Sequence, residues 1–207
     1  MGYSQAGFDE IVGVDIEPQQ NYPFEFRQGD ISKWTTLEYI LGDEGFDLIH
    51  ASPPCQAFTV YGNNKGHVRD DHPDLIEPTR KLLQASGVPY VMENVPGAPL
   101  EATFQLCGTS LGIEVRRHRL FEASFPVLAP PCYHARFTER KYPGSSNRPN
   151  GRTVMNVGEW RVPFETQKEV MEMPWVTDLR EIAEAIPPRY TKFIGEQFLS
   201  LVLEGDQ

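Results

Sequence analysis

Short apolar runs rich in Val, Ile, Phe and Tyr recur along the chain. Polar residues, Gly or Pro bound each run, which is typical of strands in a largely buried sheet. This pattern predicts strands at residues 10–16, 24–31, 46–52 and 88–95. It also predicts two more strands around a turn within residues 112–124.

Two segments have the pattern of a helix. Residues 78–87 begin with Pro78 and end with Gly87, the positions that proline and glycine favour at helix ends. The second segment, 188–203, places its apolar residues roughly on one face: Phe193, Ile194, Phe198, Leu201 and Val202. Strands that alternate with helices predict an α/β fold with a mainly parallel sheet.

The alternation of predicted strands and helices stops between residues 126 and 175. This stretch is rich in Pro, Gly, Ser, Asn and Arg, and residues 142–152 have the composition of an exposed loop. We therefore expect a core at 1–125, an irregular region at 126–175 and a C-terminal segment at 176–207 that returns to the core.

Composition narrows the class of protein. The 207 residues are 40% hydrophobic, enough for a core, and contain no apolar run long enough to cross a bilayer. The first ten residues lack the pattern of a signal peptide, so we expect a cytoplasmic protein. Three cysteines are too few for a disulfide scaffold, and we expect them reduced.

The charge is uneven. A net charge of −10 argues against a nucleic-acid partner for the chain as a whole. Residues 116–152, however, hold eight Arg and Lys against two Glu, so a locally basic segment lies within an acidic protein.

Residues able to do chemistry follow four of the predicted strands: Asp15, Asp30, Cys55 and Glu93. Ligands of open α/β sheets bind at the carboxyl ends of the strands, so these positions predict a site. The two aspartates suit the ribose and the adenine of a nucleotide cofactor, although acids that form turns are also common after strands.

Cys55 follows Pro53 and Pro54, which restrict the backbone and present the thiol at the sheet edge. Such a thiol can act as a nucleophile, or can simply be a small buried side chain. Glu93 ends an apolar strand, where burial favours a protonated carboxyl, and Asn94 follows it. Arg117 and Arg119 are two residues apart, so on a strand they would share one face. Their guanidinium groups could bind a carbonyl oxygen and a phosphate, or they could simply form a solvated basic edge.

These residues together resemble the DNA cytosine-5 methyltransferases, in the short form found in bacteriophages and bacteria. The resemblance rests on "SPPCQAF" (52–58), "ENV" (93–95) and the Arg-x-Arg at 117–119. Flanking segments support it: "AGFDEIVGVDIEP" (6–18), "GDI" (29–31) and "LREIAEAIPPRYTKFIGEQFL" (179–199).

The resemblance implies a Rossmann-like fold that uses S-adenosylmethionine and acts on double-stranded DNA in the cytoplasm of a bacterial host, for restriction–modification or phage protection. Cys55 would attack C6 of a flipped-out cytosine, with Glu93 on N3 and Arg117 on O2. Residues 59–72 would close over the base, and residues 126–175 would recognise the target. The remaining positions carried over are Asp15, Ile16, Asp30, Ile31 and Pro53 for the cofactor, and Gln56, Asn94 and Arg119 for DNA.

This sequence departs from the family at its start. The family opens with a strand and a glycine-rich turn, which "MGYSQAGF" would follow. In this fold the absent strand would lie between the strands at 10–16 and 46–52. We therefore expect an unfilled strand position there, with the two flanking strands roughly 10 Å apart. The chain would then act as a monomer, or pair with a chain that supplies the segment. Val115 replaces the frequent Gln before the arginines, and Gly195-Glu196-Gln197 replaces Gly-Asn-Ser.

Other interpretations remain open. A methyltransferase-derived chain could bind DNA or a partner without turnover. A zinc nucleobase deaminase also uses a Pro-Cys pair, but needs Pro-Cys-x-x-Cys and His-x-Glu, and Phe58 stands where the second cysteine belongs. A zinc site from Cys107, His118, Cys132 and His134 lacks the ligand-pair spacing of known sites, so the sequence predicts no metal.

Overall fold

The computed structural model describes residues 1–30, 45–55, 58, 74–132, 137–139, 152–154, 157–158 and 162–205. Its elements divide between two compact units. One unit comprises residues 1–11, 106–118 and 128–207, and the other comprises residues 12–105 and 119–127. The three-part division expected from the sequence stays a prediction.

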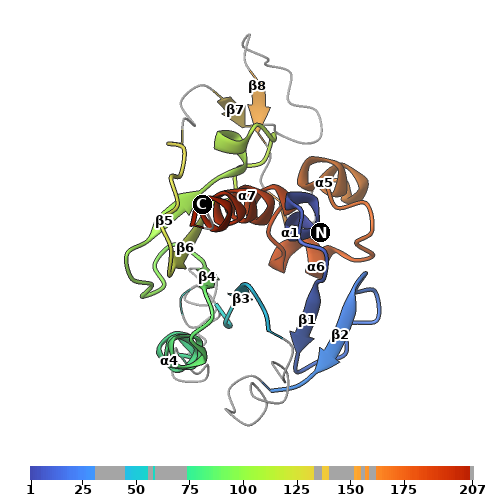
Figure 1. The fold of residues 1–207 in the computed structure, drawn as a ribbon. Helices are drawn as coiled ribbons and strands as arrows, with labels where there is room; N and C mark the ends of the chain where they lie inside the picture. Colours follow the sequence, from blue (N-terminus) through green and yellow to red (C-terminus); the bar gives the residue numbers. More distant parts are fainter. Residues whose placement is uncertain are drawn as a thin grey trace. The chain divides into compact units, whose positions relative to one another are not determined.

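The second unit contains two sheets (Figure 1). Strands β1 (Val12–Asp15) and β2 (Glu25–Gln28) pair in parallel. The other sheet has the order β3-β4-β6-β5, with β3 (Ile49–Ala51), β4 (Tyr90–Asn94), β5 (Phe104–Leu106) and β6 (Arg119–Ala123). β3 and β4 are parallel, and β4 and β6 are antiparallel. The predicted α/β class is confirmed.

β1 and β3 belong to different sheets. No ladder joins them among the described residues, and the vacancy expected between them stays a prediction. Their spacing of roughly 10 Å stays a prediction.

Helix α4 (Ile76–Ser86) covers one face of the larger sheet. It ends at Gly87, whose φ of 70° lies in the left-handed region that glycine adopts without strain. Both the helix and its glycine end were predicted from the sequence. The core between helix and sheet consists of these buried residues: Ala51, Ile76, Leu83, Tyr90, Met92 and Ala98.

The first unit is built on helices. α7 (Pro188–Gly205) confirms the predicted C-terminal helix, and α1 (Gly2–Ala6) packs against it (Figure 1). A Cβ on Gly195 would lie 2.9 Å from Ala6 Cβ and 3.0 Å from the ring of Tyr3, so α1 needs the glycine to approach this closely. α5 (Phe164–Met171) and α6 (Leu179–Glu184) complete the helices described there.

Two expectations about local structure were wrong. Residues 112–124 form one strand, β6, and an isolated bridge at Val115, because the preceding stretch follows the short 3₁₀ helix η2 (Gly108–Leu111) and turns at Gly112. The region 126–175 is not wholly irregular, since it contains α5 and the parallel strands β7 (Phe137–Glu139) and β8 (Arg152–Val154). Residues 142–151, predicted as a loop, lie outside the described residues.

None of the described helices is long and apolar enough to span a membrane.

Candidate active site

The alternation of β4 gives its two faces different surroundings. Tyr90 and Met92 belong to the core beneath α4, so Val91 and Glu93 point to the opposite face. Register places His50 beside Val91 and Phe121 beside Glu93. Glu93 therefore stands on a face shared with an imidazole and a phenyl ring.

Arg119 is the ion-pair partner of Glu93. Its Nε lies 2.9 Å from Glu93 Oε1, and the two side chains are 14% and 9% exposed. Arg119 and Phe121 are two residues apart on β6, so both lie on the face that carries Glu93. The Glu93 carboxyl is therefore held by a guanidinium in largely buried surroundings.

A hydrogen bond ties the end of β4 to the turn after β3. The Asn94 side chain donates to the carbonyl oxygen of Pro53 at 2.8 Å, and its own oxygen accepts from the Val95 N–H at 2.9 Å. Asn94 is buried, and Pro53 is buried as well. The two prolines and this bond fix the backbone that leads to Cys55.

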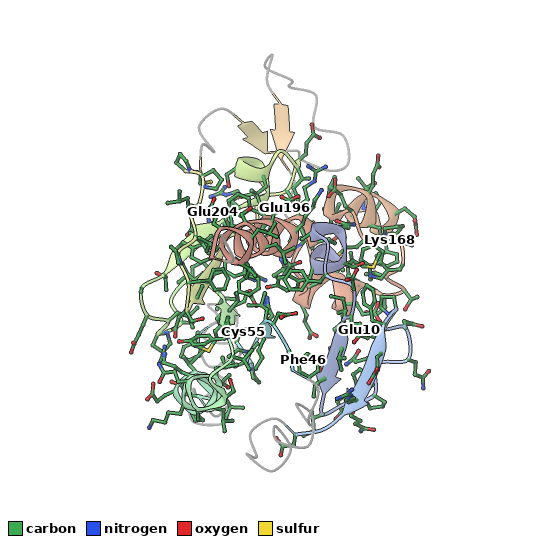
Figure 2. The ribbon with its side chains drawn as sticks, viewed as in Figure 1. Glu10, Phe46, Cys55, Lys168, Glu196 and Glu204 are labelled. Carbon is green, nitrogen blue, oxygen red and sulfur yellow. The ribbon has the colours of Figure 1, made fainter. Side chains whose placement is uncertain are left out.

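Cys55 is half-buried just beyond β3 and forms no disulfide with the other described cysteines (Figure 2). Its carbonyl accepts from the Phe58 N–H at 2.9 Å, which closes a turn directly after the cysteine. Because β3 and β4 are parallel neighbours, Cys55 and Glu93 lie at the same end of the sheet. The convergence of their reactive atoms stays a prediction.

His50 was not singled out from the sequence. Its ring contacts Phe121 edge-on at 6.4 Å between centroids, and its Nε2 lies 3.4 Å from the Ser52 hydroxyl. Burial lowers the pKa of His50 to about 4, so the ring is neutral near neutral pH. A lone histidine within an apolar strand gave no sequence signal for this position.

Arg117 differs from its prediction. It precedes β6 rather than sharing a strand face with Arg119, and it belongs to the other compact unit. Its guanidinium donates to the carbonyl of Ala183 in α6, and its own carbonyl accepts from the Tyr190 hydroxyl of α7. The C-terminal segment therefore holds Arg117, and its approach to a substrate stays a prediction.

Asp15 and Asp30 follow neighbouring parallel strands, as predicted. Asp15 is exposed, and its Oδ1 accepts from the Glu17 N–H at 2.8 Å, so it forms a turn while its carboxylate faces water. Ile16 is 60% exposed beside it, and Asp30 is half-buried. An accessible carboxylate can accept hydrogen bonds from the hydroxyls of a nucleoside, and an apolar side chain beside it can pack against the flat base. Ile31, Gln56 and the predicted closing loop 59–72 lie outside the described residues.

The described end of the larger sheet thus offers a thiol, a carboxyl paired with a guanidinium, and a buried amide. This set can add a nucleophile to an activated ring and hold the ring by its polar edge.

Comparisons with known proteins agree with the motifs. Residues 1–102 match the family model of the C-5 cytosine-specific DNA methylases. The type II methyltransferase M.AquIA of Picosynechococcus sp. is 30% identical over 108 residues, which cover 47% of this chain and 44% of that protein. This chain therefore spans less than half the length of the curated relative that it matches.

A solved structure is also similar. It is a candidate DNA modification methyltransferase encoded within a prophage in E. coli, with 21% identity and a TM-score of 0.42. The match covers 58% of this chain and 41% of that one. That score is too low to establish a common fold.

Proposed function

We propose that this chain, which belongs to the DNA cytosine-5 methyltransferase family, methylates C5 of cytosine in double-stranded DNA. The observation that carries the proposal is the arrangement at the ends of β3 and β4. Cys55 follows a rigid Pro-Pro turn, Asn94 bonds that turn to β4, and Glu93 ends β4 in an ion pair with Arg119.

The chemistry requires each of these groups. C6 of cytosine is a poor electrophile, so the Cys55 thiolate must be held in place to attack it. Glu93, in its protonated form, would donate a hydrogen bond to N3, which draws electrons from the ring and makes C6 easier to attack. Arg119 orients the Glu93 carboxyl and can also contact a DNA phosphate.

S-adenosylmethionine would supply the methyl group as an electrophile: C5 takes the methyl, and the sulfur keeps the electrons of the broken S–C bond and leaves as neutral S-adenosylhomocysteine. Asp15 and Asp30 would accept hydrogen bonds from its nucleoside, and Ile16 would pack against the base. Once C5 carries the methyl group, a base removes the C5 proton and the ring expels Cys55. The C5–C6 double bond is restored and the thiolate is free again.

The basic residues between 116 and 152 support DNA as the substrate. They concentrate positive charge in a protein of net charge −10, where phosphate binding would otherwise be unfavourable. We assign target recognition to residues 126–175.

A second function is favoured by one observation. β1 and β3 lie in separate sheets among the described residues, so the strands that lead to Asp15 and to Cys55 are not paired with each other there. A chain in which these two sheets stay apart would bind DNA or a partner without turnover.

Transfer of tritium from labelled S-adenosylmethionine to duplex DNA tests both functions. The assay has two arms: the chain alone, and the chain preceded by a strand and a glycine-rich turn of the family pattern. Transfer in either arm that Cys55→Ser abolishes supports methylation, and transfer only in the second arm supports dependence on the added strand. DNA binding without transfer in both arms contradicts the enzymatic proposal.

A further inference from the structure

Three potential metal ligands from separate segments meet in the first compact unit. Cys107 is the N-cap residue of η2, His118 directly precedes β6, and Cys132 lies in the extended stretch after Leu128. The two sulfurs and a ring nitrogen all lie within 4.8 Å of one another. Cys132 Sγ is 3.5 Å from His118 Nε2.

These separations suit zinc. With Zn–S near 2.3 Å and Zn–N near 2.0 Å, a tetrahedral ion holds a sulfur and a nitrogen roughly 3.5 Å apart, and two sulfurs roughly 3.8 Å apart. The Cys132–His118 distance therefore already has the required length. Two thiolates and an imidazole also select zinc over magnesium or calcium, which prefer oxygen ligands.

The surroundings support a bound cation rather than three unrelated side chains. The Thr109 hydroxyl lies 3.3 Å from the sulfur of Cys107 and 3.7 Å from that of Cys132. The hydroxyl can thus donate its proton to the sulfur of Cys107 and also lies beside that of Cys132, as outer partners do in known sites. Cys107 is fully buried, whereas His118 and Cys132 are half-buried, so an ion could reach the cluster.

We propose that Cys107, His118 and Cys132 bind a zinc ion. Binding converts two thiols to thiolates and releases their protons, and the fourth position is open to water or another ligand. The ion would join η2, the segment that carries Arg117, and the stretch that leads into residues 133 and beyond. The sequence offered these residues as possible ligands, but their spacing predicted no metal, because they include no Cys-x-x-Cys pair. His134, the fourth residue considered from the sequence, lies outside the described residues.

The test is the zinc content of the purified, tag-free full chain, measured by mass spectrometry of the metal after exposure to a chelator of micromolar affinity. We expect about one zinc per chain, lost in His118→Ala and Cys132→Ser and kept in Cys55→Ser, which removes the one cysteine outside the cluster. Cobalt in place of zinc should give a thiolate charge-transfer band that follows the same pattern.

Cys107→Ser should also lose the metal, but Cys107 is fully buried, so this variant can fail to fold. In that case the zinc contents of His118→Ala and Cys132→Ser, at the two half-buried positions, decide the test. A wild-type chain that holds no zinc under these conditions, or a zinc content that His118→Ala and Cys132→Ser leave unchanged, overturns the proposal. So does a mass that shows Cys107 and Cys132 joined in a disulfide in the protein as isolated.

Discussion

The two faces of the β4–β6 ladder each carry a buried arginine–glutamate pair, and the pairs differ in what surrounds them. Beneath α4, Arg80 bonds both oxygens of Glu122 at 2.9 and 2.8 Å, and Glu122 also accepts from the Tyr90 hydroxyl and the Glu101 N–H. On the opposite face, Arg119 and Glu93 meet at the strand end that leads to Cys55.

The comparison shows that an arginine–glutamate pair can stabilise the fold on one face and belong to a candidate active site on the other. Burial alone would raise the pKa of Glu122, but hydrogen bonds from Arg80, the Glu101 backbone and Tyr90 hold it below its ordinary value. Glu122 is therefore locked as a charged structural group between helix and sheet. Glu93 lies at the edge where strands of this fold class present their ligands, and there a carboxyl can exchange a proton with a substrate.

The largest expected effect is on catalysis. Glu93→Gln should lower methyl transfer by about 10³-fold, or about 4 kcal/mol of barrier, because an amide cannot protonate N3 of cytosine. Single-turnover rates with saturating DNA measure it. A Glu93→Gln enzyme with at least a tenth of the wild-type rate would remove Glu93 from the chemistry.

On the face covered by α4, substitution of the glutamate should lower stability rather than catalysis. Glu122→Gln removes the buried charged partner of Arg80 and leaves only the exposed carboxylates of Glu77 and Glu101, so it should lower the free energy of unfolding by about 3 kcal/mol. Urea unfolding followed by tryptophan fluorescence measures this loss, with Glu93→Gln as the matched variant. If Glu122→Gln and Glu93→Gln lower the free energy of unfolding equally, the proposed difference between a structural face and a catalytic face is wrong.

His50 should give the catalytic face an acid sensitivity. Because its pKa is about 4 in the folded protein and near 6.5 when unfolded, the unfolded chain binds the proton first as the pH falls. Stability that is complete above about pH 6.5 is lost progressively down to about pH 4, by about 2 kcal/mol at pH 5.

His50→Gln should remove this part of the pH dependence. The free energy of unfolding, measured from about pH 8 to about pH 5, should fall less steeply in the variant than in the wild type. Identical slopes would mean that His50 is accessible to protons in the folded protein.

The smallest effect concerns the bond between the two strand ends. Asn94→Ala leaves the Pro53 carbonyl without this donor and should cost about 1–2 kcal/mol of stability. Asn94→Asp is the matched variant, since it keeps the size but replaces the donor with an acceptor. If Asn94→Ala unfolds at the wild-type urea concentration, the bond does not hold the turn before Cys55.

Particular residues show how far sequence reasoning reached. β-branched runs and the Pro78 and Gly87 signals are local, so they predicted β1–β4 and α4 well. The Glu93–Arg119 pair depends on antiparallel register between β4 and β6, which no local pattern encodes. Arg117 was misplaced because its partner, Ala183, is 66 residues away in sequence. Cys107, His118 and Cys132 were named from the sequence as possible zinc ligands, but no metal was predicted because their spacing does not show that they meet.

The most direct test of the central claim is covalent trapping on duplex DNA that contains 5-fluorocytosine, with S-adenosylmethionine present. Fluorine on C5 cannot leave as a proton does, so the nucleophile stays attached to C6. We predict a complex that survives denaturation, maps to Cys55 by peptide mass, and is absent with Cys55→Ser. If the chain binds this DNA and the cofactor yet forms no complex, or attaches through another residue, Cys55 is not the nucleophile.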